Sequence, residues 1–423
     1  MLTQHRILRS ALEVFGDVGF RPARIDQISA RAGCSRSSFY QYFASKEDLF
    51  RKLGWQVAKR MLAIADSVGP VNSGNSGRAA LREWLDDFSE LFDSYVPVFT
   101  AFDVAADLDA DAAAGGQYVT QRHARAMEQW FAAGAAGGPR TGPTVEVWSR
   151  TFLVVVRTNR YRHHLADVGV LDRSRVNEAL AEVIHRIAFG PLPGVNLRDA
   201  LASSTTSTGG SERASAELFL ADRGSEPGST GRRTRRRLLD AAAEVFVLKG
   251  YHDTRIDDIT ERAGTSHGTF YRYFANKEQL FRTLAVRAGS RLVESLDDLV
   301  ELGLETLLED GGEDHLRRWL LKRDEIAVDA GPITRMWMEL MVVDRDLQLA
   351  SLRSVEENRR RLARFLEPRG FGDADSDALV LIALLADVGR GRPWLVKGDD
   401  DTASIEMLLQ MIQRGILGQD VGC

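Results

Sequence analysis

Cysteine is nearly absent from this sequence of 423 residues, which contains only two. Two thiols build neither a disulfide framework nor a four-thiolate metal site, so we expect a protein of a reducing cytoplasm. Long apolar runs are also absent, because no window approaches the roughly 18 consecutive apolar residues of a membrane-spanning helix. The first residues pass directly into an amphipathic pattern without the apolar core of a signal peptide, so we expect no secretion.

Enzyme and metal-site patterns are scarce as well. The sequence contains no HExxH and no P-loop, the patterns that supply paired metal ligands and a phosphate-binding backbone. His163, His164 and His185 have no partners at metal-ligand spacing. We therefore expect a protein that is not an enzyme and that holds neither a metal nor a cofactor.

The net charge of −5 is unevenly distributed along the chain. Residues 1–56 carry +4 and residues 231–287 carry +5, which leaves −14 for the remainder. A basic segment attracts a polyanion through its local field, whatever the global sum. The sequence thus indicates two nucleic-acid-binding segments in an otherwise acidic protein.

The two basic segments are copies of one another. A shift of 231 residues aligns 6–53 with 237–284 without a gap, and 26 of the 48 positions are identical. The period is too long for a solenoid, so each copy should be a complete unit with its own core. Residues 196–230 are rich in Ser, Thr and Gly and are typical of a flexible linker, although residues 214–221 have a short helical pattern.

Almost all of the remaining sequence has helical period, and we predict an all-α protein. In the first copy an apolar stripe ends at Gly19, a short helix covers 25–32, Ser35 caps a third helix over 36–43, and Ser45 caps a fourth. Further helices are predicted at 78–93, 117–133, 145–164 and 173–189 in the first copy, and at 315–328, 333–340, 347–366, 376–390 and 404–416 in the second.

A helix, a glycine-containing turn and a serine-capped second helix form the layout of a helix-turn-helix. Both copies resemble the DNA-binding domain of the TetR family of bacterial repressors in four motifs: Ile-x-x-Ile, Ala-Gly-x-Ser, Phe-Tyr-x-Tyr-Phe and Lys-Glu-x-Leu. The resemblance implies a helix-turn-helix domain followed by a helical regulatory domain in each copy. The predicted domains are 1–53 and 231–284 for DNA binding and 54–195 and 285–423 for regulation, with 196–230 as the linker.

The first turn of the third helix is the part of this motif that meets base edges. Arg36 is placed there to donate two parallel hydrogen bonds to a guanine, the commonest specific contact. The predicted base-reading residues are Arg36, Ser37, Ser38 and Gln41 in the first copy and His267, Gly268, Thr269 and Arg272 in the second.

A second set of residues should face the DNA backbone. The resemblance implies phosphate or thymine-methyl contact for Tyr40 and Tyr271. Lys46 and Lys277 begin the fourth helix, which places an ammonium toward a phosphate. The other predicted backbone contacts are Arg24, Tyr42, Arg255 and Tyr273, although core packing explains the two tyrosines equally well. The basic run 232–237 is either an arm for the minor groove or a solvated linker end.

The resemblance also implies a ligand cavity between the downstream helices, and such cavities are mostly apolar. The candidate lining residues are Trp84, Phe88, Phe99, Phe102, Trp130, Trp319, Met336, Trp337 and Met341, with ordinary core packing as the alternative for each. The fourth helix runs from Lys46 into the apolar region around Trp55, so we expect a small hydrophobic effector to act through this helix.

The leading interpretation is a transcriptional repressor that binds a double-stranded DNA operator and is released by that effector. The two copies would act as a covalent pseudo-dimer, paired through the last two helices of each, on an operator with unlike half-sites. A homodimer of tandem chains is the alternative architecture. From a different class, the chain would be a helical ligand-binding or protein-interaction module that has lost DNA binding in one or both copies.

Overall fold

The computed structural model describes residues 2–134, 143–166, 171–190, 229–340, 345–386 and 401–420. Helices joined by short connections make up this part of the chain, and it contains no strand, which confirms the all-α prediction. The first copy contains α1 (Leu2–Val18), α2 (Ile25–Arg31), α3 (Arg36–Tyr40), α4 (Lys46–Asp66), α5 (Asn75–Ser94), α6 (Val96–Leu108), α7 (Ala110–Gly134), α8 (Val145–Leu165) and α9 (Arg173–Phe189).

The second copy repeats this order with a different middle part. Its helices are α11 (Ser229–Asp253), α12 (Ile256–Arg262), α13 (His267–Tyr273), α14 (Lys277–Leu302), α15 (Leu304–Leu308), α16 (Gly312–Leu340), α17 (Arg345–Leu366), the 3₁₀ turn η3 (Glu367–Arg369), α18 (Ala374–Leu385), α19 (Asp401–Met411) and the π-helical turn η4 (Ile412–Ile416).

Three predicted segments differ from the structure. The helix predicted over 36–43 ends at Tyr40, and the two helices predicted on either side of Pro332 are one continuous helix, α16. Proline removes the backbone N–H that would bond the Val328 carbonyl, but the helix continues through it, and the Thr334 hydroxyl donates to the carbonyl oxygens of Ala330 and Gly331 on the same turn. The predicted helix at 214–221 lies outside the described residues.

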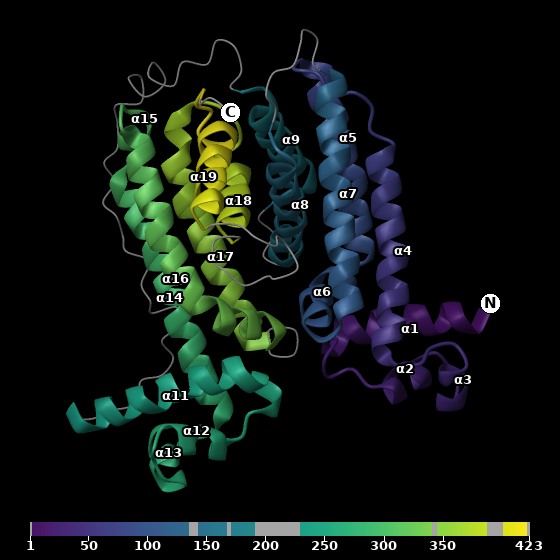
Figure 1. The fold of residues 1–423 in the computed structure, drawn as a ribbon, viewed down its shortest axis with the longest axis vertical. Coiled ribbons are helices and arrows are strands. Elements are labelled where there is room, and N and C mark those ends of the chain that lie inside the picture. Colours follow the sequence, from purple (N-terminus) through teal and green to yellow (C-terminus); the bar gives the residue numbers. More distant parts are fainter. Residues whose placement is uncertain are drawn as a thin grey trace.

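Both helix-turn-helix units lie at the same end of the molecule (Figure 1). They also touch, because Arg21 Nη2 lies 3.8 Å from Asp253 Oδ2. At the other end, α8 packs on α18, and α9 packs on α18 and η4, so helices of the two copies form one bundle. One continuous apolar core runs through the first copy and into α14–α19, while a smaller core holds α11–α14 and the end of α16.

None of the helices in the described ranges combines the length and the apolarity needed to cross a membrane.

Candidate functional site

The turn between the two motif helices is built in the same way in both copies. Gly33 and Gly264 have φ of 63° and 58°, a left-handed conformation that glycine adopts without strain. Ser35 Oγ then accepts from the Ser38 N–H at 3.1 Å, and Ser266 Oγ accepts from the Thr269 N–H at 3.2 Å, so each serine caps the helix that follows. The turn and the cap fix the angle at which α3 and α13 leave the domain.

Phenylalanines anchor the inner face of each second helix. Phe39 and Phe43 in the first copy, and Phe270 and Phe274 in the second, are at most 1% exposed. The opposite face is open to solvent, since Tyr40 is 50% and Tyr271 is 55% exposed. The exposed face also carries Arg36, Ser37, Gln41, His267, Gly268 and Arg272, with Ser38 and Thr269 half-buried beside their caps.

An aspartate on the preceding helix holds the first residue of each second helix. Arg36 Nε lies 3.0 Å from Asp26 Oδ1, and His267 Nε2 contacts Asp257 Oδ1 in the same way. Hydrogen bonding to Tyr40 and the charge of Asp26 both raise the pKa of Arg36. The sequence prediction missed these two aspartates, although the repeated Ile-Asp pair at the start of α2 and α12 marks them.

The ammonium groups of Lys46 and Lys277 point into the protein, which corrects the predicted phosphate contact. Lys46 Nζ donates to the carbonyl oxygens of Phe20, Arg21 and Ala23 at 2.8, 3.0 and 3.2 Å, and lies 4.7 Å from the Phe20 ring centroid. Lys277 makes the same three contacts with its own turn between α11 and α12. An ammonium has three donors, so these bonds use all of them.

The start of α4 still offers donors to an anion through its backbone. Ser45 Oγ accepts from the N–H of Asp48, but the first two N–H groups of a helix have no partner within the helix. These groups carry the positive end of the helix dipole and can bind a phosphate without the lysine side chain. Asn276 caps α14 in the same way through Gln279.

The remaining predicted backbone contacts divide into two kinds. Arg24 and Arg255 cap α2 and α12 and are exposed, which is compatible with a phosphate partner. Tyr42 and Tyr273 are half-buried and pack against the cores of their own domains, so at least part of each ring is structural.

The basic run 232–237 is helical rather than extended. It lies inside α11, where the Arg235 guanidinium stacks over the Phe274 ring at 5.3 Å and Arg237 donates to the Ala263 carbonyl. A minor-groove arm is an extended chain, so this placement corrects that interpretation. The residues instead lengthen α11 and support the turn at Gly264.

The same turn contains the letters of a serine-hydrolase pattern, Gly264-Thr265-Ser266-His267-Gly268. A nucleophile elbow needs a strand before the serine. Here α12 precedes the turn, and Ser266 is engaged as a helix cap. The residues match the pattern, but this turn does not form a nucleophile elbow.

Comparison with known proteins agrees with this geometry. The family model "Bacterial regulatory proteins, tetR family" matches residues 7–53 and 238–284, which are the two motif-bearing segments. Each copy of the repeat therefore carries a segment that matches the DNA-binding part of this family.

Two curated relatives show how far the likeness extends. The HTH-type transcriptional regulator TcmR of Streptomyces glaucescens is 29% identical over 192 residues, which is 42% of this chain and 80% of that protein. The uncharacterized HTH-type transcriptional regulator YdgC of Bacillus subtilis is 43% identical over 81 residues, 18% of this chain, and the match spans only 40% of that relative's length. A crystal structure of a transcriptional regulator (TerR/AcrR family) from Aquifex aeolicus aligns with 38% of this chain and 92% of its own at 21% identity and a TM-score of 0.30.

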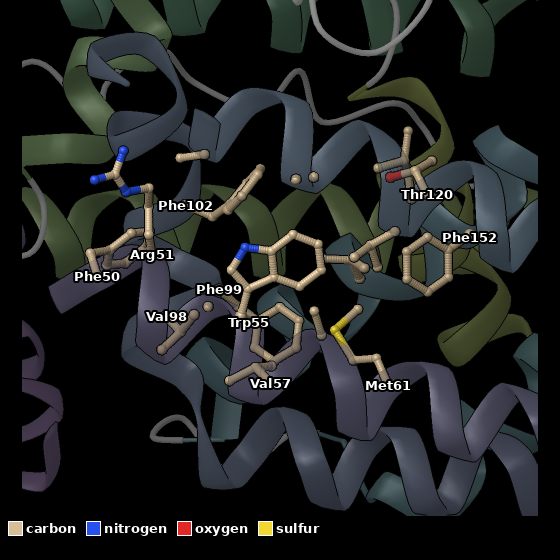
Figure 2. A pocket seen from close by; sticks show the side chains of 18 of the residues that line it. Phe50, Arg51, Trp55, Val57, Met61, Val98, Phe99, Phe102, Thr120 and Phe152 are labelled. Carbon is tan, nitrogen blue, oxygen red and sulfur yellow. The ribbon is translucent and has the colours of Figure 1, made fainter. Parts of the chain in front are cut away.

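The regulatory part of the first copy contains an apolar cavity of about 140 Å³ between α4, α6, α7 and α8. Figure 2 shows the Trp55 indole in its middle, with Phe99 and Phe102 nearby. Gly116 makes room on α7, because a Cβ there would lie 2.2 Å from the Phe102 ring. The sequence indicated the apolar region around Trp55 without including Trp55 among the lining residues, and it missed Gly116, although adjacent glycines inside a helix are an unusual signal.

Three predicted lining residues of the first copy belong to the core instead. Trp84 and Phe88 project from α5 and are at most 2% exposed, and Trp84 packs edge-on against Trp130 at 5.2 Å. α5 does not border the cavity, so these side chains fill space between helices. Phe99 and Phe102 do line it, as predicted.

The second-copy candidates that the structure describes are packed side chains. The Trp319 indole N–H donates to the Ser295 carbonyl at 2.7 Å, and Trp337 donates to Ser351 Oγ. Met336 is buried in the smaller core, and Met341 lies outside the described residues.

One arginine connects the cavity to the DNA-binding domain of the first copy. Arg51 lines the cavity from α4, and its guanidinium lies 2.7 Å from Asp111 and 3.4 Å from Asp109 at the α6–α7 junction. α4 begins at Lys46, within the DNA-binding domain. One helix, α4, therefore joins the wall of the cavity to the domain that carries α3.

Proposed function

We propose that this tandem TetR-like regulator binds one DNA operator per chain, with its two copies acting as a covalent pseudo-dimer. The observation that carries the proposal is the mixed bundle, in which α8 and α9 of the first copy pack on α18 and η4 of the second. The bundle leaves both helix-turn-helix units at one end of the molecule, where α3 and α13 are exposed (Figure 1).

The two halves of the operator should differ, because the two recognition helices differ. Arg36 offers a guanidinium fork that suits guanine, whereas His267 offers fewer donors and Gly268 offers no side chain. A symmetric dimer reads a palindrome because its recognition helices are identical. A single chain with unlike helices should read two unlike half-sites, centred about one helical turn apart.

Selection of binding sites from random duplexes by the full chain tests this proposal. We expect two half-sites, one sharper than the other, and Arg36→Ala should relax base preference in only one of them. The loss should be about 1–3 kcal/mol at the guanine, or about 5- to 150-fold. A clean palindrome that Arg36→Ala degrades equally in both halves would favour a homodimer of tandem chains, and the absence of binding to any duplex would favour a module that has lost DNA binding.

We further propose that a small apolar effector enters the cavity and releases the DNA. An apolar cavity of about 150 Å³ holds one benzene-sized molecule, so a single aromatic ring or short aliphatic chain fits the present volume. A ligand that binds better when α4 moves away from α7 shifts the population toward that state. The arginine–aspartate contacts at Arg51 would then loosen, and the spacing of the recognition helices would change.

A further inference from the structure

The two copies pack closely where η4 crosses α9. A Cβ added at Gly415 would lie 3.0 Å from Ile187 Cγ1 and 3.0 Å from Val183 Cγ1, closer than most real Cβ contacts. Gly415 has no side chain, so the isoleucine occupies that space. A side chain of the first copy also bonds the backbone of the second there, because Arg186 Nε donates to the Gly415 carbonyl at 2.8 Å.

Ile187 and Gly415 occupy equivalent positions in the two copies. α9 begins at Arg173 and α19 at Asp401, and the same offset of 228 residues relates Gly190 to Gly418, both of which have positive φ. The residue that faces Gly415 across the bundle is therefore its own counterpart. In a symmetric dimer, a residue on the two-fold axis contacts the same residue of the partner. Here one of the two equivalent positions is an isoleucine and the other is a glycine.

A buried charge is distributed just as unequally. Asp377 on α18 is fully buried, with Arg369 Nη2 at 2.7 Å from its own copy and Arg186 Nη2 at 3.9 Å from the other. The offset of 228 residues that relates α9 to α19 pairs Asp377 with Ser149, an uncharged side chain that donates to the Val145 carbonyl. The same offset pairs Arg186 with Arg414, so both copies carry the arginine and only the second carries the carboxylate.

Neither copy can reproduce the contact between Ile187 and Gly415 with itself. Two first copies would bring Ile187 against Ile187 at a spacing that is already tight for a single methyl group, and Arg186 would keep Glu182 but lose Asp377. Two second copies would place Gly415 opposite Gly415 and leave a void where the isoleucine belongs.

We propose that each copy's bundle surface is complementary to the other copy of the same chain and selects against a second copy of itself. This inference deepens the proposed pseudo-dimer and rests on it. It predicts a protein of one chain mass, 46.9 kDa, across the working concentration range. A covalent linker alone permits the pairing, but unlike surfaces make it selective.

The contact is tested with single and paired substitutions in the full chain. Gly415→Ala should lower Tm by about 5 °C through overpacking, and the same substitution should cost less when it is made in an Ile187→Ala background. Gly289→Ala on α14 is the matched control, because its Cβ would meet nothing within 4 Å and its Tm should hold or rise. If Gly415→Ala behaves like the control, the close packing is absent and the proposal is overturned.

Selectivity is tested by cutting the chain after it has folded. A protease site is placed within residues 196–228, and two preparations with different tags are cleaved, mixed and allowed to exchange. We expect every captured pair to contain one first copy and one second copy. Pairs of two first copies or two second copies would overturn the proposal, as would a stable mass of two uncut chains.

No DNA is present in these measurements, so they separate this inference from the proposed function. Selective pairing combined with a palindromic operator would leave the interface standing and remove the unlike half-sites. Unselective pairing combined with two unlike half-sites would support the proposed operator and overturn the selective interface.

Discussion

Replacing Lys46 with methionine removes an ammonium that joins α4 to the turn between α1 and α2. The structure assigns this group three carbonyl acceptors and a contact with the Phe20 ring. A hydrogen bond from a charged donor contributes about 1.5–3 kcal/mol, but Lys46 is half-buried and water reaches part of the turn. We therefore expect a loss of about 3 kcal/mol, or about 6–12 °C in Tm for a unit of roughly 200 residues.

Thermal unfolding followed by circular dichroism measures this loss, with Lys59→Met as the control on the same helix, because Lys59 is exposed. DNA binding is then measured at a temperature at which both proteins are folded. The salt slope should equal that of the wild type, because the ammonium does not face the DNA. An unchanged Tm together with a slope reduced by about one unit would refute this reasoning and restore the phosphate contact.

Three further predictions concern the interface, the core and the cavity. Asp26→Asn should tighten DNA binding several-fold in titrations at low salt, because it frees Arg36 and removes a negative charge near the phosphates. Burial lowers the pKa of His123 to about 4, so the unfolded chain binds a proton below about pH 6.5 that the folded protein resists. The free energy of unfolding should therefore fall by up to about 3 kcal/mol between pH 6.5 and 4, and His123→Phe should remove this fall in acid titrations. A benzene-sized aromatic ligand should change tryptophan fluorescence, and Trp55→Phe should abolish most of that change if the ligand occupies the cavity.

Features that depend on neighbours along the chain could be predicted from the sequence. Glycine is favoured at position 33 by the positive φ of that one residue. The helix caps formed by Ser35 and Ser45 involve only the backbone N–H three residues later. The exposed and buried faces of α3 follow helical period, so that Phe39 is buried and its neighbour Tyr40 is half exposed. The repeat itself is visible in the sequence because the two motifs have nearly the same local requirements.

Other features were decided by tertiary packing. Lysine at the start of a helix is compatible with a phosphate or with a turn, and only the position of the Phe20 carbonyl relative to Lys46 chooses between them. Trp84 on α5 and Phe99 on α6 are both large and apolar, but the first packs on Trp130 of α7 and the second lines a cavity. The difference depends on how each helix packs against its neighbours, which neither segment specifies by itself.

The sequence by itself determined that the chain carries two serine-capped helix-turn-helix motifs, because caps, turns and helical faces are set within a few residues. It also placed Ile187 and Gly415 in corresponding helices, but it gave no sign that they meet. Their contact depends on how α9 and η4 cross, and a crossing is fixed by shape complementarity over the whole bundle. Pairing through the last helices was predicted, but which residues meet across them depends on close packing, which is a property of two surfaces together.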